Sequence, residues 1–169
     1  MSHDVIIAGA GLAGMSLALA LAAQRRSVLL LDARPAPVLP AADAGFDQRI
    51  YAISPASVAW LTDLKLWQAV DAARTALVYD MRIHGDAPDA LRLPWQSALS
   101  SAVPPGLHLS AYRAGVGELC TIVEERELAR VLTQALSFAS GVDVLRPVEL
   151  ASLQCDADAA ILTLADGRV

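Results

Sequence analysis

The fold of this chain is decided by the stretch Asp4-Val5-Ile6-Ile7-Ala8-Gly9-Ala10-Gly11-Leu12-Ala13-Gly14 near its amino end. Residues 4–8 are mostly apolar and β-branched, which predicts a short buried parallel strand. Three glycines follow as G-x-G-x-x-G, and residues 12–24 are rich in the Leu, Ala and Met that favour a helix. A second apolar run at 27–31 ends at an acid. The order strand, glycine turn, helix, strand predicts an α/β, Rossmann-like fold with a mostly parallel sheet.

The glycine motif has the features of a dinucleotide-binding turn. Gly9 permits the tight turn, Gly11 lets the backbone approach a diphosphate, and Gly14 lets the helix pack closely on the strand. We expect Ala13, between the last two glycines, to belong to the same site. Asp32 should accept hydrogen bonds from the ribose hydroxyls of an adenosine, which disfavours a 2′-phosphate there. The motif does not distinguish FAD from NAD, because both present adenosine diphosphate to such a turn.

Composition excludes several other classes of protein. The 13 Lys and Arg against 18 Asp and Glu give a net charge of −5, so no broad positive field exists to bind nucleic acid. Two cysteines, Cys120 and Cys155, are too few for a disulfide framework and are expected to be buried, which fits the cytoplasm. The run 5–23 is uncharged, but its glycines divide it and the pair Arg25-Arg26 follows it, so we predict neither a transmembrane segment nor a signal peptide.

The rest of the chain predicts a cofactor domain with a β-rich insertion. Prolines make residues 33–48 an extended connection, and Ser54-Pro55 predicts the start of a helix. Residues 77–112 combine strand-like runs, the last over 107–112, with turn residues. We therefore expect the cofactor domain over 1–76 and 113–169, and the start of a substrate domain over 77–112.

Several smaller expectations complete this interpretation. Trp60 and Trp67 lie in an amphipathic stretch and should pack in the core. The three histidines are scattered without carboxylates or thiols at ligand spacing, so no metal site is predicted and no catalytic residue is assigned. Asp166-Gly167 is a tight turn without a returning strand after it, so we expect the chain to be the amino-terminal part of a longer protein.

Three stretches carry a resemblance to a known family: Asp4–Arg34; Asp47–Ser57 with Leu61 and Leu66-Trp67; and Gly117–Leu128. Their order and spacing resemble the class A FAD-dependent aromatic monooxygenases, and among them the ubiquinone-biosynthesis hydroxylases. The resemblance implies bound FAD, NAD(P)H as transient reductant, and hydroxylation of the aromatic ring of a ubiquinone precursor, with or without a polyprenyl tail. It also implies a cytoplasmic location, which includes the periphery of the inner membrane. Contact with a quinone-biosynthesis complex is a further implication of the resemblance. The alternatives are another class A flavin hydroxylase of a phenolic or antibiotic substrate, and a non-catalytic dinucleotide-binding module.

The resemblance also implies roles for individual residues. Arg49 matches an arginine near the flavin cofactor, and Arg34 is a candidate for contact near the adenine. Glu125 stands where relatives usually carry an amide that touches the cofactor. A carboxylate there would be repelled by a reduced, anionic flavin unless it is protonated or paired, with Arg126 or Arg130 as the expected partner.

The chain also departs from the family in what it lacks. Lys65 replaces a common glycine, which should alter a helix end. In relatives, an Asp-Gly motif and a second FAD motif, Gly-Asp with a nearby His, lie beyond the length that this chain spans. We therefore expect the 169 residues to hold at most the adenosine half of FAD and to catalyse no hydroxylation alone.

Overall fold

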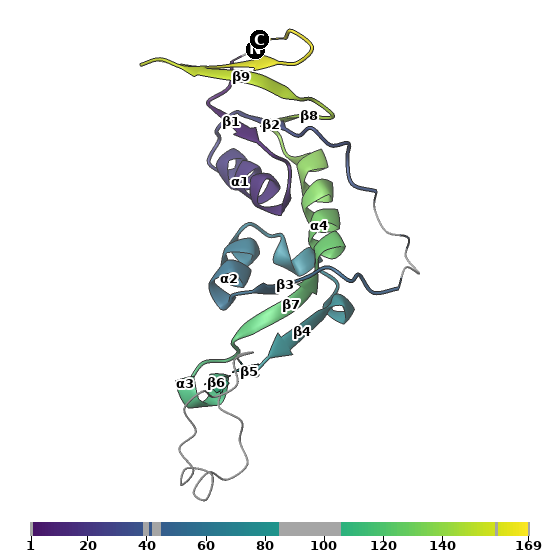
Figure 1. The fold of residues 1–169 in the computed structure, drawn as a ribbon, viewed down its shortest axis with the longest axis vertical. Coiled ribbons are helices and arrows are strands. Elements are labelled where there is room, and N and C mark those ends of the chain that lie inside the picture. Colours follow the sequence, from purple (N-terminus) through teal and green to yellow (C-terminus); the bar gives the residue numbers. More distant parts are fainter. Residues whose placement is uncertain (1, 39–40, 42–44, 85–105, 158, 169) are drawn as a thin grey trace, which may run out of the picture.

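The computed structural model describes residues 2–38, 41, 45–84, 106–157 and 159–168. A parallel sheet of order β1-β2-β8 is formed by β1 (Val5–Ala8), β2 (Val28–Leu31) and β8 (Val142–Leu145). Helices α1 (Leu12–Ala23) and α4 (Glu125–Phe138) cover one face of this sheet, as Figure 1 shows. The antiparallel pair β9 (Leu150–Cys155) and β10 (Ala160–Leu164) lies on the other face. The predicted α/β, Rossmann-like fold is confirmed.

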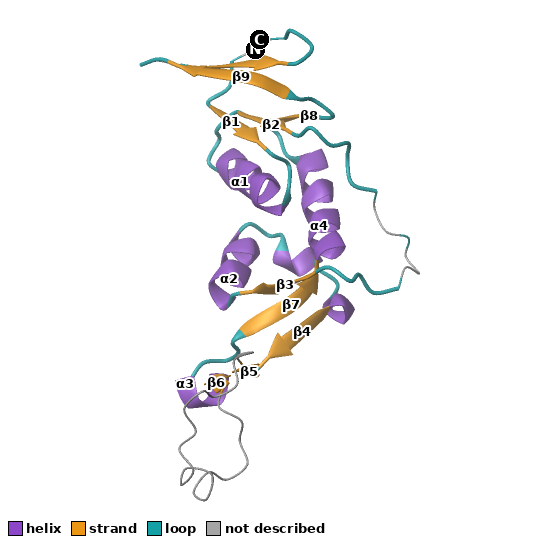
Figure 2. Cartoon of the chain, viewed as in Figure 1, coloured by secondary structure: helices purple, strands orange, loops and turns teal. Residues whose placement is uncertain are grey.

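A second, antiparallel sheet lies on the far side of the helices (Figure 2). Its order is β3-β7-β4, from β3 (Ile50–Ile53), β7 (Cys120–Glu124) and β4 (Thr75–Val78). The pair β5 (Asp80–His84) and β6 (Gly106–Ser110) continues beyond it. Around these strands lie α2 (Pro55–Asp63), α3 (Ala111–Ala114) and the 3₁₀ turns η1 (Trp67–Ala69) and η2 (Ala72–Arg74). Strand β7 runs directly into α4, so Glu124 ends the strand and Glu125 begins the helix.

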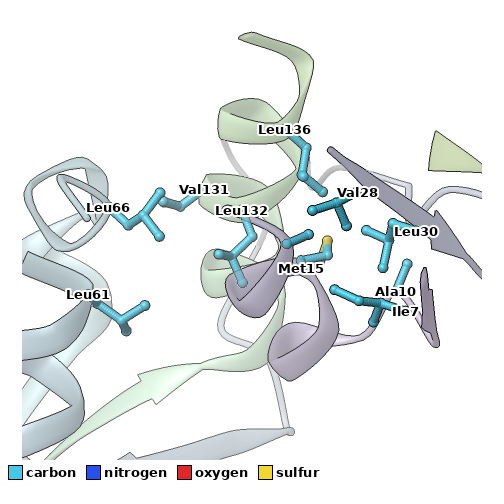
Figure 3. Packing of buried hydrophobic residues seen from close by; sticks show 11 residues of the cluster. Ile7, Ala10, Met15, Val28, Leu30, Leu61, Leu66, Val131, Leu132 and Leu136 are labelled. Carbon is cyan, nitrogen blue, oxygen red and sulfur yellow. The ribbon is translucent and has the colours of Figure 1, made fainter. Parts of the chain in front are cut away.

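The core joins both halves through α4. Figure 3 shows Met15 of α1 beside Val28 and Leu30 of β2, while Leu66 lies next to Val131 of α4. The apolar positions of α4 recur at helical spacing, which is why one side of the helix can bury residues against α1 and another against Leu66, in the segment after α2. The start of α4 is therefore fixed relative to the glycine turn of α1.

Local chain chemistry explains several element boundaries. Ser54 caps α2, its Oγ accepting a hydrogen bond from Ser57 N at 3.2 Å, with Pro55 in the first turn as expected. Lys65 follows α2 with a φ of 62°, in the left-handed region that favours glycine. A glycine would adopt this backbone without strain, and here a lysine adopts it.

Some expectations about single residues and elements were wrong. The strand expected over 107–112 covers Gly106–Ser110, because the chain turns into α3 at Ala111, whose carbonyl oxygen accepts a hydrogen bond from Val116 N at 3.1 Å. Trp60 is 43% exposed, since its neighbour Leu61 takes the buried face of α2, whereas Trp67 does pack against the core. Cys120 is buried as expected, but Cys155 is exposed on β9.

Among the described residues, no helix is both long and apolar enough to cross a membrane. The division into a cofactor domain, 1–76 and 113–169, and a substrate domain that begins over 77–112 stays a prediction.

Candidate cofactor site

The glycine turn between β1 and α1 has two glycines that the chain itself requires. Gly9 has a φ of +112°, which L side chains rarely adopt. A Cβ on Gly14 would overlap the carbonyl oxygen of Gly9, so a larger residue there would force the helix away from the strand. These two positions are explained by the fold alone.

Gly11 is different, because nothing in the described part of the chain requires it to be glycine. Its φ of −76° suits any residue, and a Cβ there would have no described atom within 4 Å. Gly11 is also the N-cap of α1, and no side chain caps the helix start there. The turn thus presents uncapped amides and a bare backbone to open space, which is the geometry of an anion site at a helix N-terminus.

Asp32 fastens the turn to the end of β2. Its Oδ2 accepts a hydrogen bond from Ala10 N and its Oδ1 one from Arg34 N, both at 2.7 Å. The hydrogen bond from the Arg34 backbone lowers the pKa of the Asp32 carboxyl, outweighing the opposing effect of burial. The carboxylate is therefore ionised at neutral pH. Its Oδ1 also lies 3.5 Å from Arg34 Nε, so Oδ2 is the oxygen that keeps a lone pair for a further donor. Its contact with a ribose stays a prediction.

A cavity of about 360 Å³ lies in front of this turn. It is lined by Ala10, Gly11, Leu12, Met15, Asp32, Arg34, Pro35, Ala36, Pro37, Glu125, Ala129 and Arg146. Four of the predicted site residues are in this lining, namely Gly11, Asp32, Arg34 and Glu125. Gly9, Ala13 and Gly14 are absent from it. Gly9 and Gly14 shape the turn behind, and Ala13 lies exposed in the first turn of α1. Arg49 reaches the edge of the cavity through Glu125.

Arg146 is a cavity residue that the sequence analysis missed. It follows β8 directly, at the same edge of the parallel sheet as the glycine turn after β1 and Asp32 after β2. Residues just after the carboxyl ends of parallel strands gather at ligand sites. Its place after a predicted strand was the signal that could have found it.

Glu125 pairs with Arg49, so the expected pairing with Arg126 or Arg130 is wrong. Arg49 Nε lies 3.0 Å from Glu125 Oε2, and Glu125 N donates a hydrogen bond to Arg49 O at 2.9 Å. Arg126 instead pairs with Glu124 and Arg130 with Glu127. Consecutive residues on a strand end and a first helical turn point in different directions, and this assigns each arginine to a different carboxylate.

Glu124 and Glu127 are buried, and each holds a separate cluster of donors. Glu124 accepts hydrogen bonds from Arg74, Arg126 and the Asp47 amide, at 3.1, 2.9 and 2.8 Å. Burial acts to raise its pKa, but these donors together lower it. The pKa of Glu127 is lowered as well, first by the hydrogen bonds from Arg130. The two clusters fix the first turn of α4, and with it the wall of the cavity that carries Glu125.

Known proteins are similar to this chain in fold and, in part, in sequence. Residues 7–73 match the NAD(P)-binding Rossmann-like domain family. The chain is 29% identical to a ubiquinone hydroxylase, UbiL, of Rhodospirillum rubrum over 98% of its residues, which cover 34% of that protein. It is 33% identical to 3-demethoxyubiquinol 3-hydroxylase of Escherichia coli, again over 98% of its residues and 38% of that protein. The chain is similar to ubiquinone-biosynthesis hydroxylases over nearly its whole length.

This confirms the family resemblance seen in the sequence. The chain spans just over a third of the length of these two hydroxylases. In fold it is similar to PqsL of Pseudomonas aeruginosa, described as a probable FAD-dependent monooxygenase. The TM-score is 0.64 at 19% identity, over 98% of this chain and 39% of that one.

The cavity of this chain fits one part of a dinucleotide. Its volume is at the small end of the range for ligand pockets, about 300–1,000 Å³, which suits a nucleoside diphosphate better than a complete FAD. The open backbone at Gly11 and the side chains of Arg34 and Arg146 offer partners for phosphate oxygens.

Proposed function

We propose that this chain forms the adenosine-diphosphate-binding part of a FAD-dependent monooxygenase that NAD(P)H reduces and that hydroxylates the aromatic ring of a ubiquinone precursor. The single observation that carries the proposal is the bare backbone of Gly11, which faces a cavity at the carboxyl edge of the parallel sheet. A glycine that the chain itself does not need is explained by a ligand that does need it. The names of the relatives support a quinone precursor as substrate.

In this proposal each wall residue binds or orients the cofactor. The amides at the start of α1 bind the diphosphate, and Asp32 orients the adenosine ribose. Arg146 neutralises phosphate charge, and Arg34, beside Asp32, contacts the adenine end. FAD, when bound and reduced, supplies the oxygen chemistry, and no catalytic residue is assigned to the described part of the chain.

Substrate, location and partners follow from the relatives and form part of the same proposal. A polyprenylated ring would be met at the surface of the inner membrane, with the protein at its periphery and in contact with a quinone-biosynthesis complex. The cavity of the described residues suits the adenosine end of FAD, and the proposal assigns the flavin end to no residue of it.

The test is a titration of the purified chain with FAD, ADP and NAD, followed by calorimetry and by the visible spectrum. We expect FAD and ADP to compete for one site, and Gly11→Ala to weaken both by about tenfold or more, equivalent to about 1.4 kcal/mol, without a change in thermal stability. A colourless protein that binds NAD but not FAD would support the non-catalytic module instead. Binding unaffected by Gly11→Ala would contradict the proposed site.

A further inference from the structure

We infer that Glu125 limits the affinity of the cavity for a diphosphate by holding Arg49, so that a bound anion and this carboxylate compete for one guanidinium. The inference rests on the proposed function, because it concerns the same cavity. Glu125 thereby helps to determine the affinity for the diphosphate, and Arg49 has the diphosphate as a second partner besides Glu125.

The first support is the position of the pair at the cavity. Glu125 is a lining residue, and its side chain is 31% exposed. Arg49 is 67% exposed, and its guanidinium also lies 5.9 Å from the ring centre of Tyr51. A guanidinium exposed in this way can turn toward the cavity without leaving a buried group unsatisfied.

The second support is a backbone tether that keeps Arg49 in place. The last residue pair of β3 and β7 is Ile50 with Glu124, and one step beyond it Glu125 N donates to Arg49 O at 2.9 Å. This hydrogen bond does not involve either side chain. When the ion pair opens, Arg49 therefore stays at the edge of the cavity and only its side chain moves.

The third support is the contrast with the neighbouring arginines. Arg126 and Arg130 pair with carboxylates whose side chains are only 5% and 8% exposed, and Arg130 also donates to Ala69 O at 2.8 Å. Separating such buried pairs is costly. The exposed pair of Arg49 and Glu125 is of the kind that contributes little, so it can open on ligand binding.

The fourth support is the charge of the cavity wall. Its two carboxylates are Asp32 and Glu125. Asp32 accepts hydrogen bonds from two backbone amides in addition to its ion pair with Arg34 at 3.5 Å, whereas the ion pair of Glu125 is with Arg49, outside the lining. If Arg49 turns to a diphosphate, Glu125 is left with its charge uncompensated beside an anion. Binding then includes the loss of the ion pair and a new repulsion, both of which the Glu125→Gln substitution removes.

The experiment measures the dissociation constants of FAD, ADP and adenosine by calorimetry for the full chain and for Glu125→Gln. We expect the substitution to tighten FAD and ADP by about three- to tenfold at low salt, from two interactions of roughly 0.5 kcal/mol each. The gain should shrink at high salt, and adenosine, which has no phosphate, should show none. Glu149→Gln, an exposed glutamate outside the cavity lining, is the matched control for the change in net charge.

An Arg49→Gln background distinguishes competition for Arg49 from simple repulsion. With Arg49 absent, Glu125→Gln removes only the repulsion, so its gain should become smaller. An equal gain in affinity in both backgrounds, or no gain in either, would overturn the inference. The proposed function would still stand in that case, provided that the unmodified chain binds ADP. If neither FAD nor ADP binds any variant, the proposed function fails and the inference fails with it.

Discussion

Two parts of the cavity wall are built in different ways. The glycine turn between β1 and α1 is shaped by backbone contacts, with Gly14 pressed against Gly9 and Asp32 bonded to the turn. The first turn of α4 is instead positioned by three ion pairs to the buried carboxylates of Glu124 and Glu127. The first wall has one possible arrangement, whereas the second contains both rigid and adjustable contacts.

The difference lies in what each wall can change when a ligand arrives. A turn made of backbone and packed glycines cannot rearrange without unfolding locally. A wall of ion pairs can exchange one partner for another wherever the pair is exposed. The cavity therefore combines a fixed anion site with an adjustable charge beside it. Substitutions in the two walls should separate these properties.

The largest effect is expected where a buried ion pair is broken. Glu124→Gln leaves Arg74 and Arg126 without their shared carboxylate, so we expect a loss of about 3 kcal/mol or more in the free energy of unfolding. Urea unfolding followed by circular dichroism measures this loss. Glu149→Gln, which changes the same charge at an exposed position, should alter stability by no more than about 0.5 kcal/mol. Equal effects of the two variants would show that the Glu124 cluster does not stabilise α4.

The next effect concerns the fixed wall. Gly14→Ala places a methyl group against the Gly9 carbonyl, so we expect it to destabilise the chain by about 1–3 kcal/mol. Gly11→Ala, at an ordinary backbone conformation facing open space, should leave stability within about 0.5 kcal/mol. Thermal unfolding of both variants without ligand measures the difference. A stable Gly14→Ala variant would mean that helix and strand are less closely packed than the structure has them.

Acid should weaken the ion pairs at the first turn of α4. The pKa values of Glu124 and Glu127 are lowered in the folded chain, so their ionised forms stabilise it fully above the ordinary value of about 4.5. That contribution is lost as the pH falls through the folded-state pKa values. We expect the free energy of unfolding to decline below pH 4.5, and to decline less steeply in Glu124→Gln. Urea titrations between pH 7 and pH 3 measure both slopes, and parallel slopes would contradict the assignment.

The glycine turn between β1 and α1 could be predicted from the sequence because its signals are local. The apolar strands, the glycine spacing and the acid after the second strand all lie within residues 4–32 and have known geometric consequences. The strands β3 and β7 were not predicted, since each is short and β7 leads without a break into the helical pattern of α4. Local patterns contain no information on which strands pair.

The ion pairs at the first turn of α4 depend on that pairing. Arg49 meets Glu125 only because Ile50 lies opposite Glu124, a register between strands far apart in the sequence. Four charged residues in succession, Glu124 to Glu127, offered several partners at similar spacing, and the expected partners Arg126 and Arg130 proved to be those of Glu124 and Glu127. Which carboxylate is buried is decided by the direction in which the chain leaves β7 for α4.

The smallest expected effect is on the partly exposed pair of Arg49 and Glu125. A double-mutant cycle of Arg49→Gln and Glu125→Gln in the chain without ligand should give a coupling of about 0–1 kcal/mol in the free energy of unfolding, reduced at high salt. The reason is that both side chains are exposed enough to be solvated when they separate. A cycle of Arg126→Gln with Glu124→Gln should give a clearly larger coupling, because that carboxylate is buried. If the Arg49 cycle gave as large a coupling as the buried pair, Arg49 would be a structural residue of the α4 start, unavailable to any ligand.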